Sequence, residues 1–171
     1  MGTAGTGKSY LIQAIQCRLL EIARNNGLII KSPILVLALT GVAAFNIHGA
    51  MIYSALSIPV NSSNFDIGGE RLKQLQKRLH DVKYIIIDEK SMVGRKMLTL
   101  IDMRLRQAFP KHQDQPFGNR SVILIGDFGQ LPPVMDDAMY MQNLRRDPLS
   151  NNGMSAYKQF QEVYNLDVVQ H

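Results

Sequence analysis

The sequence predicts an α/β domain in which helices flank a parallel sheet, and three observations carry that prediction. Continuous apolar runs at residues 34–39, 84–87 and 122–125 indicate strands that are covered on both faces. Segments with helical periodicity separate these runs, and a polar residue or a glycine follows each run closely. Because strands and helices alternate along the chain, right-handed crossovers and a parallel sheet are expected.

The helices are expected at residues 8–24, 71–79 and 95–109, where apolar side chains recur every three or four positions. Asn25, Asn26 and Gly27 provide the stop signal of the first helix. Residues 58–69 and 110–119 are expected to be loops, and residues 131–148 are expected to be irregular.

Length and composition exclude several classes of protein. The 171 residues fit one domain, and a composition of 46% hydrophobic and 19% charged residues excludes a disordered tail, a collagen and a coiled coil. The single cysteine, Cys17, excludes an internal disulfide and favours a reducing compartment. No apolar run approaches the ~20 residues that span a bilayer, so no membrane partner is expected. A net charge of +5 permits a polyanionic partner.

The start of the chain matches the phosphate-binding pattern G-x-x-x-x-G-K-S/T. Glycines let successive backbone N–H groups surround a phosphate, the lysine reaches the β and γ oxygens, and the hydroxyl holds Mg²⁺. A flexible glycine-rich terminus is the alternative, and the strand that should lead into such a loop is missing. The predicted nucleotide-binding residues are Gly2, Thr3, Ala4, Gly5, Thr6, Gly7, Lys8 and Ser9, with Lys8 also catalytic and Ser9 also a metal ligand.

Two further segments follow predicted strands and carry residues suited to phosphate chemistry. Asp88 and Glu89 end the run at 84–87, where the first acid orients a magnesium-bound water and the second polarises the attacking water. In isolation, such a pair is usually a solvated turn, and the upstream phosphate loop favours the catalytic interpretation. Gln130, after the third strand, is placed to touch the γ-phosphate or its attacking water, so we count it as both catalytic and nucleotide-binding.

The phosphate loop, the segment D-E-K-S-M-V at 88–93 and the segment G-D-F-G-Q-L-P-P-V at 126–134 together resemble the petite integration frequency family of ATP-dependent DNA helicases, which are RecD-like. The resemblance covers nearly the whole chain. It implies a RecA-like P-loop NTPase domain that lacks its first strand, so that residues 1–171 form a partial first motor domain without the second RecA-like domain. In the expected sheet, the strand that ends at Asp88 lies between the other two strands, and the strand at 122–125 forms an open flank. A later strand is expected at 164–168, and residues 1–6 are expected to be mobile.

Family membership further implies ATP as substrate with Mg²⁺, single-stranded and duplex DNA as partners, and five-prime to three-prime movement driven by two RecA-like domains. It implies roles in DNA repair, recombination and telomere maintenance, in the nucleus or the mitochondrion. The segment after the first apolar run resembles the family's contact with single-stranded DNA, which assigns Thr40, Gly41, His48 and Tyr53 to DNA binding. Tyr53 stands where the family has a histidine.

Two rival functions are open at this stage. One is a P-loop phosphotransferase such as a small kinase, against which the segment at 126–134 counts. The other is an inactive helicase remnant that serves only as a nucleotide- or DNA-binding module.

Overall fold

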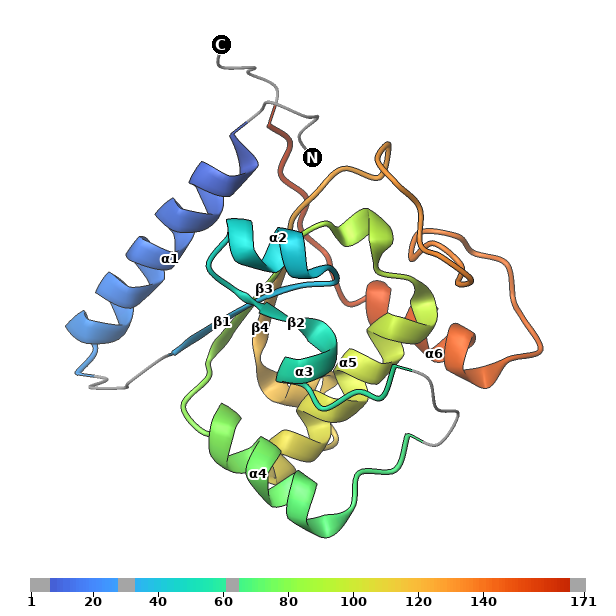
Figure 1. Cartoon of the computed structure of the whole chain (residues 1–171), viewed down its shortest axis with the longest axis horizontal. Helices are drawn as coiled ribbons and strands as arrows, with labels where there is room; N and C mark the ends of the chain where they lie inside the picture. Colours follow the sequence, from blue (N-terminus) through green and yellow to red (C-terminus); the bar gives the residue numbers. More distant parts are fainter. Residues whose placement is uncertain (1–6, 28–32, 61–64, 167–171) are drawn as a thin grey trace.

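The computed structural model describes residues 7–27, 33–60 and 65–166 (Figure 1). Its helices, strands and 3-10 turns follow one another as α1 (Lys8–Asn25), β1 (Ile34–Ala38), α2 (Gly41–Asn46), β2 (Ala50–Met51), α3 (Ile52–Ala55), α4 (Gly69–Leu79), β3 (Tyr84–Ile87), η1 (Lys90–Met92), α5 (Arg95–Ala108), η2 (Pro110–His112), η3 (Pro116–Asn119), β4 (Ser121–Leu124) and α6 (Pro148–Tyr157).

A four-stranded sheet in the order β2-β1-β3-β4 forms the centre, and every neighbouring pair is parallel. The predicted α/β class is confirmed, as is the position of β3, which precedes Asp88, between the other two predicted strands. The two-residue strand β2 was not predicted. It follows Gly49, where a Cβ would lie 2.7 Å from the carbonyl oxygen of Val36, so only glycine allows the chain to approach β1 this closely.

Helices cover both faces of the sheet, which explains why the strand sequences are apolar throughout. On one face, Ile12 of α1 and Ile47 after α2 pack with Val36 and Ile86. On the other face, α3, α4 and α5 pack against Leu37, Ile85 and Ile87, which form the larger of the two apolar clusters. In Figure 1, α1 lies apart from α4, α5 and α6, on the opposite side of the strands. No helix in the described ranges is both long and apolar enough to cross a membrane.

Several boundaries and elements differ from the sequence predictions. The third strand lies at 121–124 rather than 122–125, and the expected loop at 110–119 contains the turns η2 and η3. Helix α6 was missed because Asn151, Asn152 and Gly153 are weak helix formers. Its start does carry local helix signals: Pro148 occupies the first turn, and Asp147 caps the helix by accepting a hydrogen bond from the N–H of Leu149 at 3.0 Å.

The open flank of the sheet lies at β4. Within the described ranges β4 pairs with β3 alone, as predicted. The prediction of a later strand at 164–168 is wrong for residues 164–166, because they form no strand. Residues 167–168 lie outside the described ranges. Among the described residues no strand lies beside this segment to pair with it. The predicted mobile segment at 1–6 also lies outside the described residues.

Candidate active site

The residues predicted to carry chemistry gather where the parallel strands end. Thr40 follows β1, Asp88 and Glu89 follow β3, and Gly126 follows β4 by two residues. Ligands of open α/β sheets bind beyond these carboxyl ends, because loops there are free to carry functional groups. The fold therefore places segments from distant parts of the sequence at one edge.

The described part of the phosphate loop consists of Gly7, Lys8 and Ser9, and Gly2, Thr3, Ala4, Gly5 and Thr6 lie outside the described residues. Gly7 adopts a left-handed conformation with φ of 75°, which glycine adopts without strain, and its carbonyl accepts the N–H of Leu11 at 2.9 Å. Lys8 and the exposed Ser9 occupy the first turn of an 18-residue helix. Helix amides and a lysine at this end favour an anionic ligand.

Asp88 is buried beside this helix end. Its N–H donates to the carbonyl of Leu37 at 2.9 Å, which continues the β1–β3 pairing by one residue. Burial raises the pKa of the Asp88 carboxyl, while the N–H of Glu89 and the positive charge of Lys8 act in the opposite direction. The carboxyl is therefore shielded from bulk water, and lies within electrostatic reach of Lys8.

The oxygen donors at this position suit a small hard cation. Mg²⁺ usually takes one or two protein oxygens and completes its shell with water and phosphate oxygens, and Asp88 and the Ser9 hydroxyl are oxygen donors of that kind. In the ranges that the structure covers, no cluster of three or more histidine, cysteine, aspartate or glutamate residues forms a metal site of its own.

Glu89 has a left-handed backbone, with φ of 53° and ψ of 44°. Few residues other than glycine adopt this conformation, and such strain concentrates at functional positions. Here it turns the chain from β3 into the short helix η1. The Oγ1 of Thr40 lies 3.5 Å from Oε2 of Glu89, a long hydrogen bond that links the end of β1 to the end of β3.

Glu89 and Gln130 line one cavity of about 530 Å³ at this edge. The N–H of Gln130 donates to the carbonyl of Asp127 at 3.1 Å, and the N–H of Gly129 donates to the Asp127 carboxylate at 3.0 Å. This compact turn holds Gln130 opposite Glu89. Lys8 does not line this cavity but lines an adjoining groove along β4.

Sequence analysis missed two residues of this site. Ser91 is 3% exposed and lines the same cavity, and its hydroxyl is buried without a hydrogen-bond partner within the described chain. Lys90 is buried with its ammonium group 4.4 Å from the ring centre of Phe128, and burial lowers its pKa against the opposing charge of Asp127. Both residues are in the segment at 88–93, so the motif itself could have indicated them.

Close packing joins the ends of β3 and β4. The N–H of Lys90 donates to the carbonyl of Ile125 at 3.0 Å. Gly126 has φ of 137°, and a Cβ at this position would lie 2.9 Å from the backbone nitrogen of Lys90. A larger residue would push apart the two segments that carry Glu89 and Gln130.

The loop after Gln130 is fixed to helix α5. The carboxylate of Asp136 accepts hydrogen bonds from the N–H groups of Lys96 at 2.9 Å and Met97 at 3.3 Å, which caps the helix. Gly94 makes room for this carboxylate, because a Cβ there would collide with it. Arg145 also pairs with Asp137 through two hydrogen bonds of 2.8 and 2.7 Å. These contacts hold the loop in one position.

The four residues predicted to bind DNA do not share one cavity. Thr40 caps α2 by accepting the N–H of Ala43 at 3.2 Å, and Gly41 is the exposed first residue of that helix. His48 is exposed, with φ of 51°. Tyr53 is half-buried and lines a separate cavity of about 550 Å³ together with Arg71 and Arg104. Of the four, Thr40 forms a hydrogen bond with a predicted catalytic residue, Glu89.

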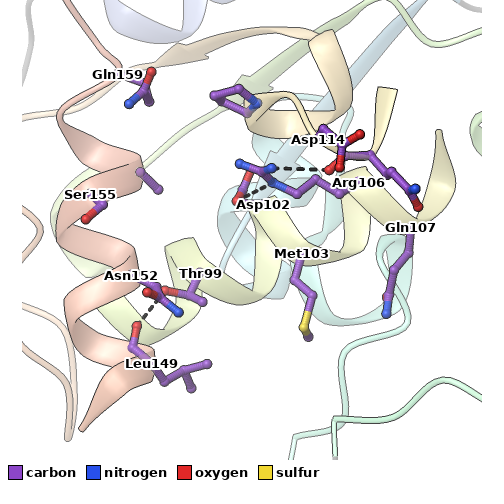
Figure 2. A pocket seen from close by; sticks show the side chains of 13 residues that line it. Thr99, Asp102, Met103, Arg106, Gln107, Asp114, Leu149, Asn152, Ser155 and Gln159 are labelled. Atoms are coloured by element: carbon purple, nitrogen blue, oxygen red, sulfur yellow. Dashed lines mark hydrogen bonds and ion pairs between the residues drawn. The ribbon is translucent and has the colours of Figure 1, made fainter. Parts of the chain in front are cut away.

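A cavity of about 650 Å³ between α5 and α6 contains none of the predicted site residues (Figure 2). Asn152, Ser155 and Gln159 approach it from the side of α6, while Asp102 and Arg106 project from α5. Arg106 donates to the Asp102 carboxylate at 2.8 Å, and the same carboxylate accepts the N–H of Phe117 at 2.5 Å. Asp102 and Arg106 thus pair with each other across the α5 side of this cavity.

Comparison with known proteins identifies relatives of the whole chain. A family model described as PIF1-like helicase matches residues 1–165. The ATP-dependent DNA helicase PIF1 of Saccharomyces cerevisiae is 34% identical over 139 residues, which cover 80% of this chain and 15% of that protein. The ATP-dependent DNA helicase Pif1 of Bdellovibrio bacteriovorus is 32% identical over 165 residues, which cover 95% of this chain and 34% of that protein.

Solved structures show the same relationship. The Pif1 helicase from Bacteroides in complex with ADP-AlF3 and single-stranded DNA has 32% sequence identity and a TM-score of 0.57, with 79% of this chain and 29% of that chain covered. The chain therefore spans about a third or less of the relatives and structures described above.

Proposed function

The chain belongs to the PIF1-like helicase family and has its RecA-like α/β fold, and we propose that residues 1–171 form the first motor domain of an ATP-dependent DNA helicase. In this proposal the domain binds and hydrolyses ATP at the carboxyl ends of its strands. A second RecA-like domain is the proposed partner that completes the motor.

A single observation carries this proposal: Glu89 and Gln130, from segments after two different strands, line one cavity, and Asp88, next to Glu89, lies within electrostatic reach of Lys8. Lys8 and the loop at 2–9 hold the phosphates, and Lys8 also neutralises charge that develops during phosphoryl transfer. Glu89 takes the proton of the attacking water, and Gln130 orients that water or the γ-phosphate.

Ser9 and Asp88 are the residues proposed to hold magnesium. When bound, this ion would neutralise negative charge on the phosphates. Burial raises the pKa of Asp88 and so disfavours its ionised form, and the positive charge of a bound cation would favour that form again.

We further propose that Thr40, Gly41, His48 and Tyr53 contact single-stranded DNA, with duplex DNA as the substrate of the complete motor. The Bacteroides relative bound to single-stranded DNA supports this partner. Thr40 would couple the two sites, because it begins the exposed helix α2 and also hydrogen-bonds Glu89. By family resemblance the complete protein would act in DNA repair, recombination and telomere maintenance, in the nucleus or mitochondrion.

The proposal is tested by measuring hydrolysis and unwinding on the same preparation. We expect slow hydrolysis of Mg·ATP that oligo-dT stimulates, measured with protein in excess over radiolabelled ATP. The rate should be low, because an arginine finger from a partner domain is worth about 10³–10⁵ in rate. A gel assay should detect no strand separation, because alternating grip on DNA needs two domains. Processive unwinding by a monomer would contradict the motor-domain assignment, and DNA binding without hydrolysis would indicate the inactive module.

A further inference from the structure

Lys90 is a buried cation to which the proposed function gives no role. It directly follows Glu89, begins the short helix η1 and is only 8% exposed. Among the described residues its ammonium group forms no ion pair, and it lies instead 4.4 Å from the ring centre of Phe128. Burying a charge costs free energy, and an apolar side chain of the same length would fill this space without that cost.

The side chain and backbone of Lys90 contact the segment that follows β4. The N–H of Lys90 donates to the carbonyl of Ile125 at 3.0 Å. Its stem packs against Gly126, where a Cβ would lie 3.2 Å from the Lys90 Cγ. Its ammonium group then lies over the ring of Phe128. One residue therefore links the end of β3 with the first residues after β4.

The ring of Phe128 also packs against two tyrosines. The ring centres of Tyr140 and Tyr157 lie 4.9 and 6.2 Å away, with interplanar angles of 68° and 80°. Burial lowers the pKa of Lys90, while the charge of Asp127 acts in the opposite direction. The negative face of the ring also favours the cation. An aliphatic side chain could fill the same space, but it would lack this attraction.

The segment that Lys90 contacts is the turn that presents Gln130. The carboxylate of Asp127 accepts the N–H of Gly129 at 3.0 Å, and its carbonyl accepts the N–H of Gln130 at 3.1 Å. Because these bonds close the turn on itself, a displacement of its base moves the turn as a unit. Gln130 lines the cavity at this edge of the sheet, so such a displacement changes the site.

We propose that Lys90 is a positioning residue: its ammonium group, held on the ring of Phe128, fixes the turn at 127–130 and so keeps Gln130 opposite Glu89. This inference rests on the proposed function, because it concerns the rate of ATP hydrolysis at that site. A small displacement of a group that orients a reactant lowers the rate steeply. Loss of the lysine charge should therefore lower turnover and leave the affinity for Mg·ATP unchanged.

The test compares Lys90→Met with Lys90→Arg in single-turnover hydrolysis, paired with a Mg·ATP titration of each protein. Methionine keeps a similar stem without the charge, whereas arginine keeps the charge and also stacks on aromatic rings. We expect Lys90→Met to lower turnover by about tenfold at unchanged affinity, and Lys90→Arg to recover most of the rate. Arg120→Met is the matched control, because it removes the cation over the Phe109 ring just before β4 and should leave turnover unchanged.

A double variant separates positioning from packing. If Lys90 acts through Gln130, Lys90→Met should slow hydrolysis much less in a Gln130→Ala background, whereas a general loss of packing would slow both proteins equally. The contact itself is measured by NMR of lysine-labelled protein. One ε-methylene signal should be shifted upfield by the Phe128 ring, should disappear in Lys90→Met, and should lose its shift in Phe128→Leu.

Three results would overturn the positioning role and leave the proposed function intact. They are parent-like turnover of Lys90→Met, an equal loss in the Gln130→Ala background, and a loss of affinity as large as the loss of rate. A parent protein that hydrolyses no ATP would contradict the proposed function itself, and the role of Lys90 with it. If Lys90→Met fails to fold, Phe128→Leu removes the same contact from the other side, and its turnover decides.

Discussion

Replacement of Glu89 by glutamine is expected to lower the rate of ATP hydrolysis by about 10²–10⁴, with little change in the affinity for Mg·ATP. Glutamine keeps the shape of the side chain and its contact with Thr40, but cannot accept a proton at neutral pH. A general base acts mainly in the transition state, whereas Lys8 and a magnesium ion act already in the bound ground state. The loss should therefore appear in turnover rather than in binding.

The measurement is single-turnover hydrolysis with protein in excess, paired with a nucleotide titration of the same preparation. Glu70→Gln is the matched control, because it removes the same charge from an exposed position in the first turn of α4 and should change neither quantity. If Glu89→Gln weakens binding as much as it slows turnover, Glu89 holds the nucleotide and another group is the base.

Substitution of Gly153 by alanine should cause a large loss of stability. A Cβ at this position would overlap the carbonyl oxygen of Arg95 and approach its carbonyl carbon and Cα. These are backbone atoms of α5, so α6 must shift away from its main packing partner. Overpacking of this kind costs about 3 kcal/mol, and for a domain of this length that lowers the thermal midpoint by about 6–12 °C.

Thermal unfolding followed by circular dichroism measures this effect. Gly69→Ala is the control, since its Cβ would meet open space at the exposed start of α4 and alanine is the better helix former by up to about 1 kcal/mol. Its midpoint should stay level or rise slightly. A Gly153→Ala protein as stable as the parent would show that α6 does not pack closely against α5.

The sheet could be predicted because three of its strands are continuous apolar runs in the sequence. Residues 84–87 are apolar at every position, which is the pattern of a short strand that is buried on both faces of the sheet. Helix α6 could not be found in this way, since its stability depends on contact between Gly153 and Arg95, which are distant in sequence. The predicted strand at 164–168 failed over its described residues because strand formation needs a neighbour, and β4 lies across a groove from this segment.

In the candidate site, the identity of the residues could be predicted from the sequence, but their arrangement could not. Motifs indicate which residues carry chemistry, so Lys8, Asp88, Glu89 and Gln130 could be chosen from the sequence alone. Their geometry depends on features that the spacing of the motifs along the sequence does not reveal. Examples are the left-handed backbone of Glu89 and its hydrogen bond with Thr40. The motif at 88–93 could have indicated Ser91 as part of the site, but not that its hydroxyl is buried at a cavity wall.

The central claim is that the Lys8 helix end and the nearby Asp88 bind Mg·ATP. Titration calorimetry with Mg·ATP tests it directly, with Lys8→Ala as the test variant and Lys77→Ala, which removes an exposed lysine of α4, as the control. We expect weak saturable binding that Lys77→Ala retains and Lys8→Ala loses. Undetectable binding at millimolar nucleotide, or binding that survives Lys8→Ala unchanged, would contradict the assignment of the site.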